Sequence, residues 1–278
     1  MMKTKTYCWL TMLAFCFGVM TTGFAQIGKP VGESIQKKLN TNFELTSYSP
    51  FIKESKSEKN LDNTLQATPS ALLFSLDTKV LSDLRKDNNS LIQLDLPMGA
   101  GSVTLTLEKY SPLAPDFKVN TPEGYVTYES TMTHFRGVID GVPNSVVGLS
   151  ISDNSIQGIV TSSEGNFNLG QLENSNLFVL YSDRDMEMPS SSFCGVTNEL
   201  QVVKENIGEA GQKSGGTCVQ VYMELNDDVY DHFGSTQASV DFISAVFNEV
   251  SILYSNENLT VQISEVFVWT SNSPYGTS

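Results

Sequence analysis

Apolar and polar residues alternate through most of the stretch from residue 69 to residue 181. A period of two places alternate side chains on opposite faces of an extended backbone, so this pattern predicts half-buried β-strands. The breaks between them carry turn residues, such as Asp140-Gly141. The predicted strands are Ala71–Asp77, Ser90–Leu96, Gly101–Tyr110, Tyr125–Glu129, Thr133–Ile139, Val146–Ile151, Ser155–Thr161, Asn166–Leu169 and Leu177–Tyr181. Because no convincing helix separates these short strands, we expect residues 69–205, the strand-rich region, to form an antiparallel sandwich or barrel-like fold.

The pattern changes after residues 206–216, which contain four glycines and no apolar periodicity, as expected of a linker. The C-terminal segment, residues 217–278, opens with a predicted strand at Cys218–Leu225. A helix N-capped by Ser235 follows, and then a second strand at Leu259–Trp269. A strand–helix–strand unit joins parallel strands through a right-handed crossover, so this segment is predicted to be a partial α/β unit.

The predicted helix carries a broad apolar stripe, made of Val240, Ile243, Phe247, Val250 and Tyr254 and widened by Phe242, Val246 and Leu253. A segment of this size buries too little surface to fold alone. It is either an appendage docked on the strand-rich region or the opening part of a larger, truncated domain. The breadth of the stripe favours the larger domain.

The N-terminus has the features of a secretory signal peptide. Two lysines precede a mostly apolar stretch at Tyr7–Met20, and Gly23-Phe24-Ala25 predicts cleavage after Ala25. The apolar stretch is short for a membrane span, and no later stretch is longer, so we expect a secreted, extracellular chain without a membrane span. Residues 26–68 are polar and lysine-rich, and we expect a flexible lead-in with one short helix at Val31–Leu39.

The chain is strongly acidic, with 31 Asp and Glu against 17 Lys and Arg and a formal net charge of −14. Loss of the signal peptide removes two lysines and no acid, which makes the exported chain more acidic still. Such a surface repels phosphate backbones, so nucleic acid is excluded as a partner.

Few residues in this sequence suit catalysis. Cys8 and Cys16 leave with the signal peptide, so the exported chain keeps Cys194 and Cys218, a pair that would ordinarily form a disulfide outside the cell. The histidines are His134, expected to be structural, and His232, expected in an exposed loop. They do not form the H-E-x-x-H pattern of a zinc peptidase helix.

Acidic residues offer one further candidate site. Asn226-Asp227-Asp228 supplies oxygen ligands that suit calcium, although acids at the end of a strand are usually solvated. The residues leave calcium undecided.

Three stretches resemble the adamalysin/reprolysin family of metzincin zinc metallopeptidases. Cys194-Gly195-Val196-Thr197 is similar to the cysteine-switch motif that ends the family's propeptide. Upstream, His134–Ser150 and Ile156–Val160 resemble the propeptide core. The family's catalytic domain opens with a strand, a helix and a second strand. The stretches that resemble these three elements are, in the same order, Val219–Leu225, Gln237–Tyr254 and Asn258–Ile263.

The resemblance implies that the chain is the N-terminal fragment of a secreted, zinc-dependent metalloendopeptidase zymogen. Cys194 would be the inhibitory zinc ligand in the full-length protein, while the catalytic ligands are absent from this chain, which should be inactive by itself. Substrates would be proteins and peptides. An activating protease would cut in the 204–216 region, where Lys204 and Lys213 lie. The lack of a basic convertase site after Cys194 suggests a bacterial member.

A different class of function stays open, that of a non-catalytic secreted β-rich module for binding, adhesion or protease inhibition. Such a module would carry a Cys194–Cys218 disulfide. A count of free thiols under denaturing conditions distinguishes the two.

Overall fold

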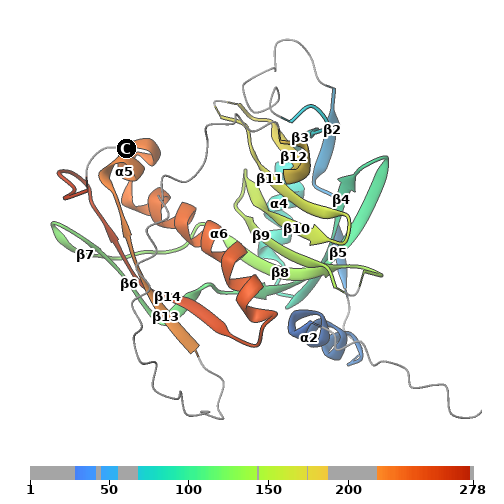
Figure 1. Cartoon of the computed structure of the whole chain (residues 1–278), viewed down its shortest axis with the longest axis horizontal. Helices are drawn as coiled ribbons and strands as arrows, with labels where there is room; N and C mark the ends of the chain where they lie inside the picture. Colours follow the sequence, from blue (N-terminus) through green and yellow to red (C-terminus); the bar gives the residue numbers. More distant parts are fainter. Residues whose placement is uncertain are drawn as a thin grey trace, which may run out of the picture.

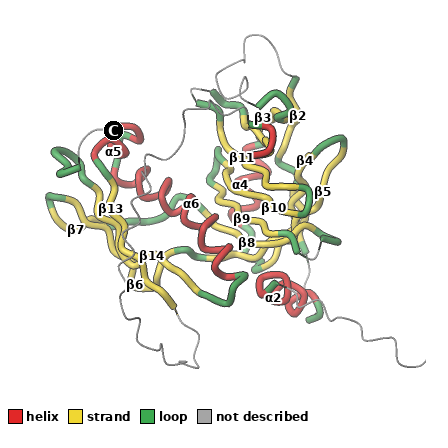
Figure 2. Tube along the Cα trace, viewed as in Figure 1, coloured by secondary structure: helices red, strands yellow, loops and turns green. Residues whose placement is uncertain are grey.

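The computed structural model describes residues 29–41, 45–55, 68–142, 144–173, 175–186 and 218–275. The predicted signal peptide, the switch motif at Cys194–Thr197 and the glycine-rich linker lie outside the described residues. Within them the chain forms two β-sheets, with one long helix, α6 (Thr236–Ser255), lying between the two (Figure 1). Strands far outnumber helices, as Figure 2 shows, so the predicted mainly-β fold followed by an α/β segment is confirmed.

The large sheet is a strongly curled, half-barrel sheet of ten strands in the order β1-β4-β5-β8-β9-β10-β11-β12-β3-β2. Its pairings are antiparallel except for β1 with β4, which is parallel. The strands are β1 (Thr46–Tyr48), β2 (Phe51–Glu54), β3 (Leu72–Leu76), β4 (Leu91–Met98), β5 (Gly101–Tyr110), β8 (Thr133–Ile139), β9 (Val146–Ile151), β10 (Ile156–Ser162), β11 (Gly165–Gln171) and β12 (Phe178–Ser182). A short 3₁₀ helix, η2 (Asp183–Asp185), follows β12.

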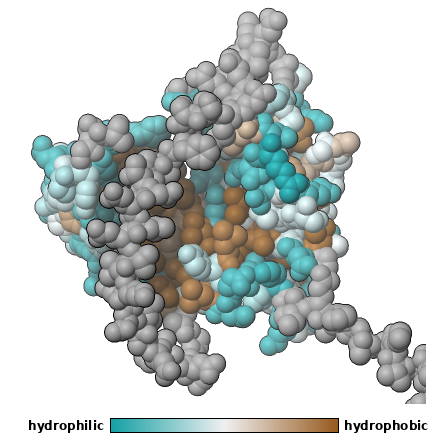
Figure 3. Space-filling view, in the orientation of Figure 1, coloured by the Kyte–Doolittle hydropathy of each residue, from teal (hydrophilic) through white to brown (hydrophobic). Residues whose placement is uncertain are grey.

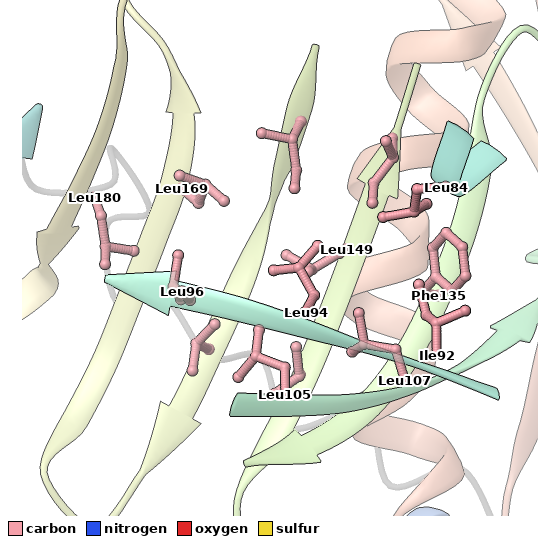
Figure 4. Packing of buried hydrophobic residues seen from close by; sticks show 14 of the residues in the cluster. Leu84, Ile92, Leu94, Leu96, Leu105, Leu107, Phe135, Leu149, Leu169 and Leu180 are labelled. Atoms are coloured by element: carbon pink, nitrogen blue, oxygen red, sulfur yellow. The ribbon is translucent and has the colours of Figure 1, made fainter. Parts of the chain in front are cut away.

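Alternate residues of these strands point into one apolar core, which the curled sheet encloses (Figure 4). Leu94 of β4, Leu105 of β5 and Leu149 of β9 are fully buried there. Helix α4 (Thr78–Lys86) adds Leu81 and Leu84 to the same core, and the carboxylate of Asp77 caps its first turn. The prediction that no helix interrupts the strands was wrong at α4, a helix of nine residues, because two core leucines are too few to show a helical period.

The small sheet has the order β13-β14-β6-β7 and combines strands from the middle of the chain with strands from its C-terminal segment. Strands β13 (Cys218–Leu225) and β14 (Thr260–Val268) are parallel and joined through α6, which confirms the predicted crossover unit. Strand β6 (Leu113–Thr121) adds to β14 in parallel, and β7 (Gly124–Val126) pairs with β6 in antiparallel. A hairpin from the strand-rich region therefore completes the sheet of the C-terminal segment.

The sequence pattern did not predict β6, and its irregular pairing explains why. Its register with β14 shifts between Ile263 and Glu265, and Pro115 lies in the part of β6 that makes no paired contact. Proline cannot donate a ladder hydrogen bond and is confined to such irregular positions in strands. Strand β6 therefore lacks the clean alternation by which its neighbours were recognised.

Two other parts of the chain differ from the prediction. Strands β1 and β2 lie within the stretch expected to be a flexible lead-in, whereas the short helix expected there is confirmed as α2 (Pro30–Leu39). The loop expected around His232 is instead a helix, α5 (Asp227–Phe233), which ends at Gly234 in the left-handed conformation.

Helix α2 is held to the large sheet by a buried ionic cluster around Glu108. The Glu108 side chain is 1% exposed and accepts from Lys38 Nζ at 2.6 Å and from Arg136 Nε at 2.7 Å. Burial alone would raise the pKa of Glu108, but the hydrogen bond from Lys38 and the charge of Arg136 outweigh it and hold the pKa below its usual range.

We predict that Glu108→Ala destabilises the protein by about 3 kcal/mol, because the substitution leaves two cations beside a buried site without their carboxylate. Urea unfolding measures the loss. Glu257→Ala is the matched control, since Glu257 forms a single ion pair with Lys29 and its side chain is 71% exposed. The control should cost less than about 1 kcal/mol. Equal losses of stability in the two variants would show that the buried cluster contributes no more than an exposed ion pair.

Candidate functional site

Helix α6 contacts both sheets, and its contact with the large sheet concentrates the buried polar groups of the C-terminal segment. We call this contact, between α6 and strands β8 and β9, the α6 seam. The polar residues of α6 in or beside it recur at helical spacing: Asp241, Ser244, Asn248, Ser251 and Ser255. The first four are buried in spite of their polarity. The seam is therefore a polar interface inside the molecule.

Asp241 anchors one end of the α6 seam. Its carboxylate accepts from Tyr128 Oη at 2.7 Å and from both the backbone N–H and the hydroxyl of Thr131, at 3.2 and 2.7 Å. Burial, together with the hydrogen bond to Asp241 and the charge of its carboxylate, raises the pKa of Tyr128 well above its usual range, so the phenol stays protonated and keeps donating. These bonds fix the start of α6 to the loop that precedes β8.

Asn248 crosses the middle of the seam. Its side-chain NH₂ donates to the carbonyl oxygens of Phe135, at 3.2 Å, and Leu149, at 3.1 Å, on adjacent strands. Gly148 faces α6 at this point, and a Cβ there would already be in van der Waals contact, 3.4 Å from the side chain of Ile252 and 3.5 Å from the Cα of Glu249, so a side chain beyond alanine has no room. A larger residue at 148 would push α6 away from the sheet.

His134 lies in the same polar cluster, with its Nδ1 2.8 Å from the hydroxyl oxygen of Ser150. That oxygen also lies 3.4 Å from the NH₂ of Asn248, which can only donate. The Ser150 hydrogen is therefore free to go to Nδ1, and we assign the imidazole proton to Nε2, which has no hydrogen-bond partner among the described residues. Burial lowers the pKa of His134 to about 4, so the ring is neutral at pH 7.

A serine beside a histidine resembles a nucleophile and its base, but access decides against that role. Ser150 is 1% exposed and His134 6% exposed, beneath a helix, so no substrate reaches them. The pair is structural, as expected for His134 from its place in a strand. Among the described residues only one of the two ring nitrogens of His134 has a hydrogen-bond partner, so protonation of this buried ring would destabilise the seam.

Glu249 is a further titratable group beside the seam whose pKa is strongly shifted. It follows Asn248 on α6, and its Cα lies close to Gly148 of β9. Burial raises its pKa to about 7. The strands packed against α6 there carry His134 and Arg136 in β8 and no charged residue in β9 or β10.

The two groups oppose each other as pH changes, which gives a test of the seam. Neutral His134 contributes stability that is lost as pH falls from about 6.5 to about 4, since the unfolded chain binds the proton more tightly. Protonated Glu249 contributes stability that is lost as pH rises from about 4.5 to about 7. We predict that the free energy of unfolding of His134→Asn, relative to that of wild type, decreases as pH rises from 4.5 to 6.5. For Glu249→Gln the same difference should increase over this range. Thermal unfolding across this range measures both, and parallel profiles would contradict the assignment.

The other candidate residues from the sequence lie apart from the seam. Cys218 is exposed at the start of β13 and has no disulfide partner among the described residues; its Sγ lies 3.5 Å from Oε1 of Gln262. His232 is exposed on α5 and stacks edge-on against Phe233. Cys194, Gly195, Val196 and Thr197 fall outside the described residues, so their proposed role stays a prediction.

The candidate calcium ligands are engaged in local structure. Asn226 caps α5 by accepting from the backbone N–H of Asp227, and the carboxylate of Asp227 accepts from the N–H of Ser273. Across the described ranges no group of three or more His, Cys, Asp or Glu side chains is arranged to hold a metal ion. These residues by themselves do not fit a zinc centre. None of the helices among them is long and apolar enough to cross a membrane.

Comparison with known proteins gives only distant similarity. No family model matches the chain, and no curated protein matches it. Among solved structures, metalloproteinase-II from Bacteroides fragilis is similar over 71% of this chain and 58% of its own length, with 9% identity and a TM-score of 0.37. A chaperone–substrate complex is similar over 49% of this chain and 86% of its own, with 12% identity and a TM-score of 0.28. The chain thus spans less than two thirds of that metalloproteinase, a distant structural neighbour.

Sequence reasoning missed Asp241 and Asn248, the residues that hold α6 to the large sheet. A signal for them exists, because the polar stripe of α6 keeps the same spacing as its apolar stripe. Polar stripes usually face solvent, and only the position of the large sheet shows that this one does not.

Proposed function

We propose that this chain is the N-terminal part of a secreted zinc metalloendopeptidase zymogen, in which the strand-rich region is the propeptide and the C-terminal segment begins the catalytic domain. The carrying observation is the order of features along the chain: a Cys194-Gly195-Val196-Thr197 motif, a glycine-rich linker, and then a parallel strand–helix–strand unit at residues 218–268. The unit's parallel pairing and crossover helix agree with the opening elements that the resemblance implies.

The surface of the C-terminal segment supports its assignment to a larger α/β domain. One face of α6 contacts the small sheet and another contacts the large sheet, but a third face is apolar and open. On it Phe242, Val250 and Leu253 are 36%, 39% and 49% exposed. In Figure 3 apolar residues gather in the middle of the view, where Figure 1 shows α6. An exposed apolar patch of this kind is typical of a surface that another part of a protein covers.

The exposed edge of β13 also supports the assignment of the C-terminal segment to a larger domain. Strand β13 is the outermost strand of the small sheet, and Val219 and Tyr222 on it are exposed. It carries eight residues and neither proline nor lysine, the devices that commonly protect a free edge. We propose that further strands and helices of the full-length protein cover both surfaces.

In this proposal Cys194 is the inhibitory ligand of the catalytic zinc. A thiolate is a strong zinc ligand and would occupy the position that catalysis needs for water. The described residues do not supply the other ligands, which the proposal assigns to sequence beyond residue 278. The fragment of 278 residues should therefore be latent for lack of a zinc site and not because of Cys194.

The role of Cys194 is tested in the full-length product, with Cys218 as an internal control. We predict that Cys194→Ala gives a proenzyme that cleaves a fluorogenic peptide without proteolytic maturation, whereas Cys218→Ala remains latent. If the two cysteines instead formed a disulfide, both substitutions would break the same bond and behave alike. Continued latency of the Cys194→Ala proenzyme would sink the switch.

The fragment itself provides a second, simpler test. We predict two free thiols per molecule in the secreted chain when it is titrated under denaturing, non-reducing conditions, and no chelator-sensitive peptidase activity after zinc is added. An absence of thiols in the monomer would indicate the Cys194–Cys218 disulfide and favour a non-catalytic binding, adhesion or inhibitor module.

A further inference from the structure

We infer that the strand-rich region is a tight noncovalent partner of the C-terminal segment, supplies part of its core, and remains bound after the connection between residues 186 and 218 is cut. This goes beyond a latency switch and does not rest on the proposed function, because it requires neither zinc nor Cys194. It follows from three independent contacts between the two parts.

The first contact is a shared sheet. Strand β6 from the strand-rich region pairs in parallel with β14, so β14 is an internal strand between β13 and β6. One side-chain and one backbone hydrogen bond reinforce the pairing near the irregular register. Asn120 donates to Glu265 Oε1 at 2.8 Å, and the N–H of Ile263 donates to the carbonyl of Pro112 at 2.8 Å. Removal of β6 would leave the ladder groups of β14 without partners.

The second contact is a shared apolar core, in which residues from both sides of the connection pack together. The strand-rich region contributes Leu113, Phe117, Val119, Val126 and Tyr128. The C-terminal segment contributes fully buried Val240, Ile263, Val266 and Val268, among others. Val119 is 1% exposed and lies opposite Val266 in the sheet, so it occupies the middle of this core. Neither part can withdraw without exposing the other's apolar residues to water.

The third contact is the α6 seam, extended by helix α2. Asp241 and Asn248 direct their hydrogen bonds at the strand-rich region, and each would lose them on separation. At the far end of α6, Asn256 Oδ1 accepts from the N–H of Val31 at 3.3 Å, and Lys29 pairs with Glu257 at 2.9 Å. A buried polar group left without its partner costs more than the bond itself contributes, so the contact is expected to separate cooperatively.

None of these contacts uses a residue between 187 and 217. A cut in that stretch removes the covalent link and leaves these three contacts in place, so we expect the two parts to stay associated with the loss of the tether alone. The C-terminal segment would then be freed by a second event that dismantles the strand-rich region, such as peptide-bond hydrolysis within the β6–β7 hairpin. Cutting the connection and releasing the partner are thus separate steps.

The test is a specific protease site inserted into residues 206–216 of the full chain, followed by complete cleavage and size-exclusion chromatography under native conditions. We expect both pieces to elute together at the volume of the uncut protein and to unfold in a single transition. Elution as two separate species would overturn the inference. Because the readout is association, it stands apart from any failure of the zinc or thiol tests.

Variants identify the interface responsible. In the cut protein, Val119→Asp should release the C-terminal piece, since it places a charge in the shared core. Tyr125→Asp, on the same hairpin but 66% exposed, is the matched control and should leave the pieces together. If Val119→Asp prevents folding of the uncut chain, Asn120→Ala replaces it, and hydrogen exchange of β14 amides in the cut protein should rise at least several-fold. Unchanged exchange, or release by Tyr125→Asp alone, would show that β6 does not hold the pieces together.

Discussion

The described structure depends on one helix that is shared by two sheets. Helix α6 joins β13 to β14, and the small sheet covers one of its faces as in any parallel crossover unit. A second face is polar, and it is buried because the outer surface of β8 and β9 offers carbonyl groups and a glycine at the point of contact. If α6 lost either sheet, a face built for burial would meet water.

The choice of polar groups in the α6 seam has a physical consequence. Apolar contacts tolerate sliding, whereas Asp241 and Asn248 satisfy particular hydrogen bonds and so set the position of α6 along the strands. The same groups make separation costly, and they place a neutral histidine and a protonatable carboxylate at one interface. The position of α6, the cost of separating it from the sheet and the predicted pH response therefore all depend on this one interface.

The hairpin β6–β7 links the two halves in another way. In the chain it lies between β5 and β8 of the large sheet, but it pairs with β14 (Thr260–Val268) of the small sheet. An edge strand is an open template for pairing, and here the chain provides the partner for β14 while β13 stays open. The two sides of the β13–β14 pair thus have different partners. On the β14 side the partner is β6 of the strand-rich region, and on the β13 side we assign the partner to the remainder of a larger domain.

The sequence by itself determined the local elements. Alternation located strands such as Gly101–Tyr110 and Thr133–Ile139, and helical spacing with a serine cap located α6, because these signals depend only on neighbours along the chain. It did not reveal the irregular strand β6 or the short helix α4, whose signals are weak. Only the tertiary structure decided that Asp241 and Asn248 are buried and that the C-terminal segment borrows a strand. The reason is physical: a side chain's partner across an interface is set by the packing of distant elements, and no local pattern records it.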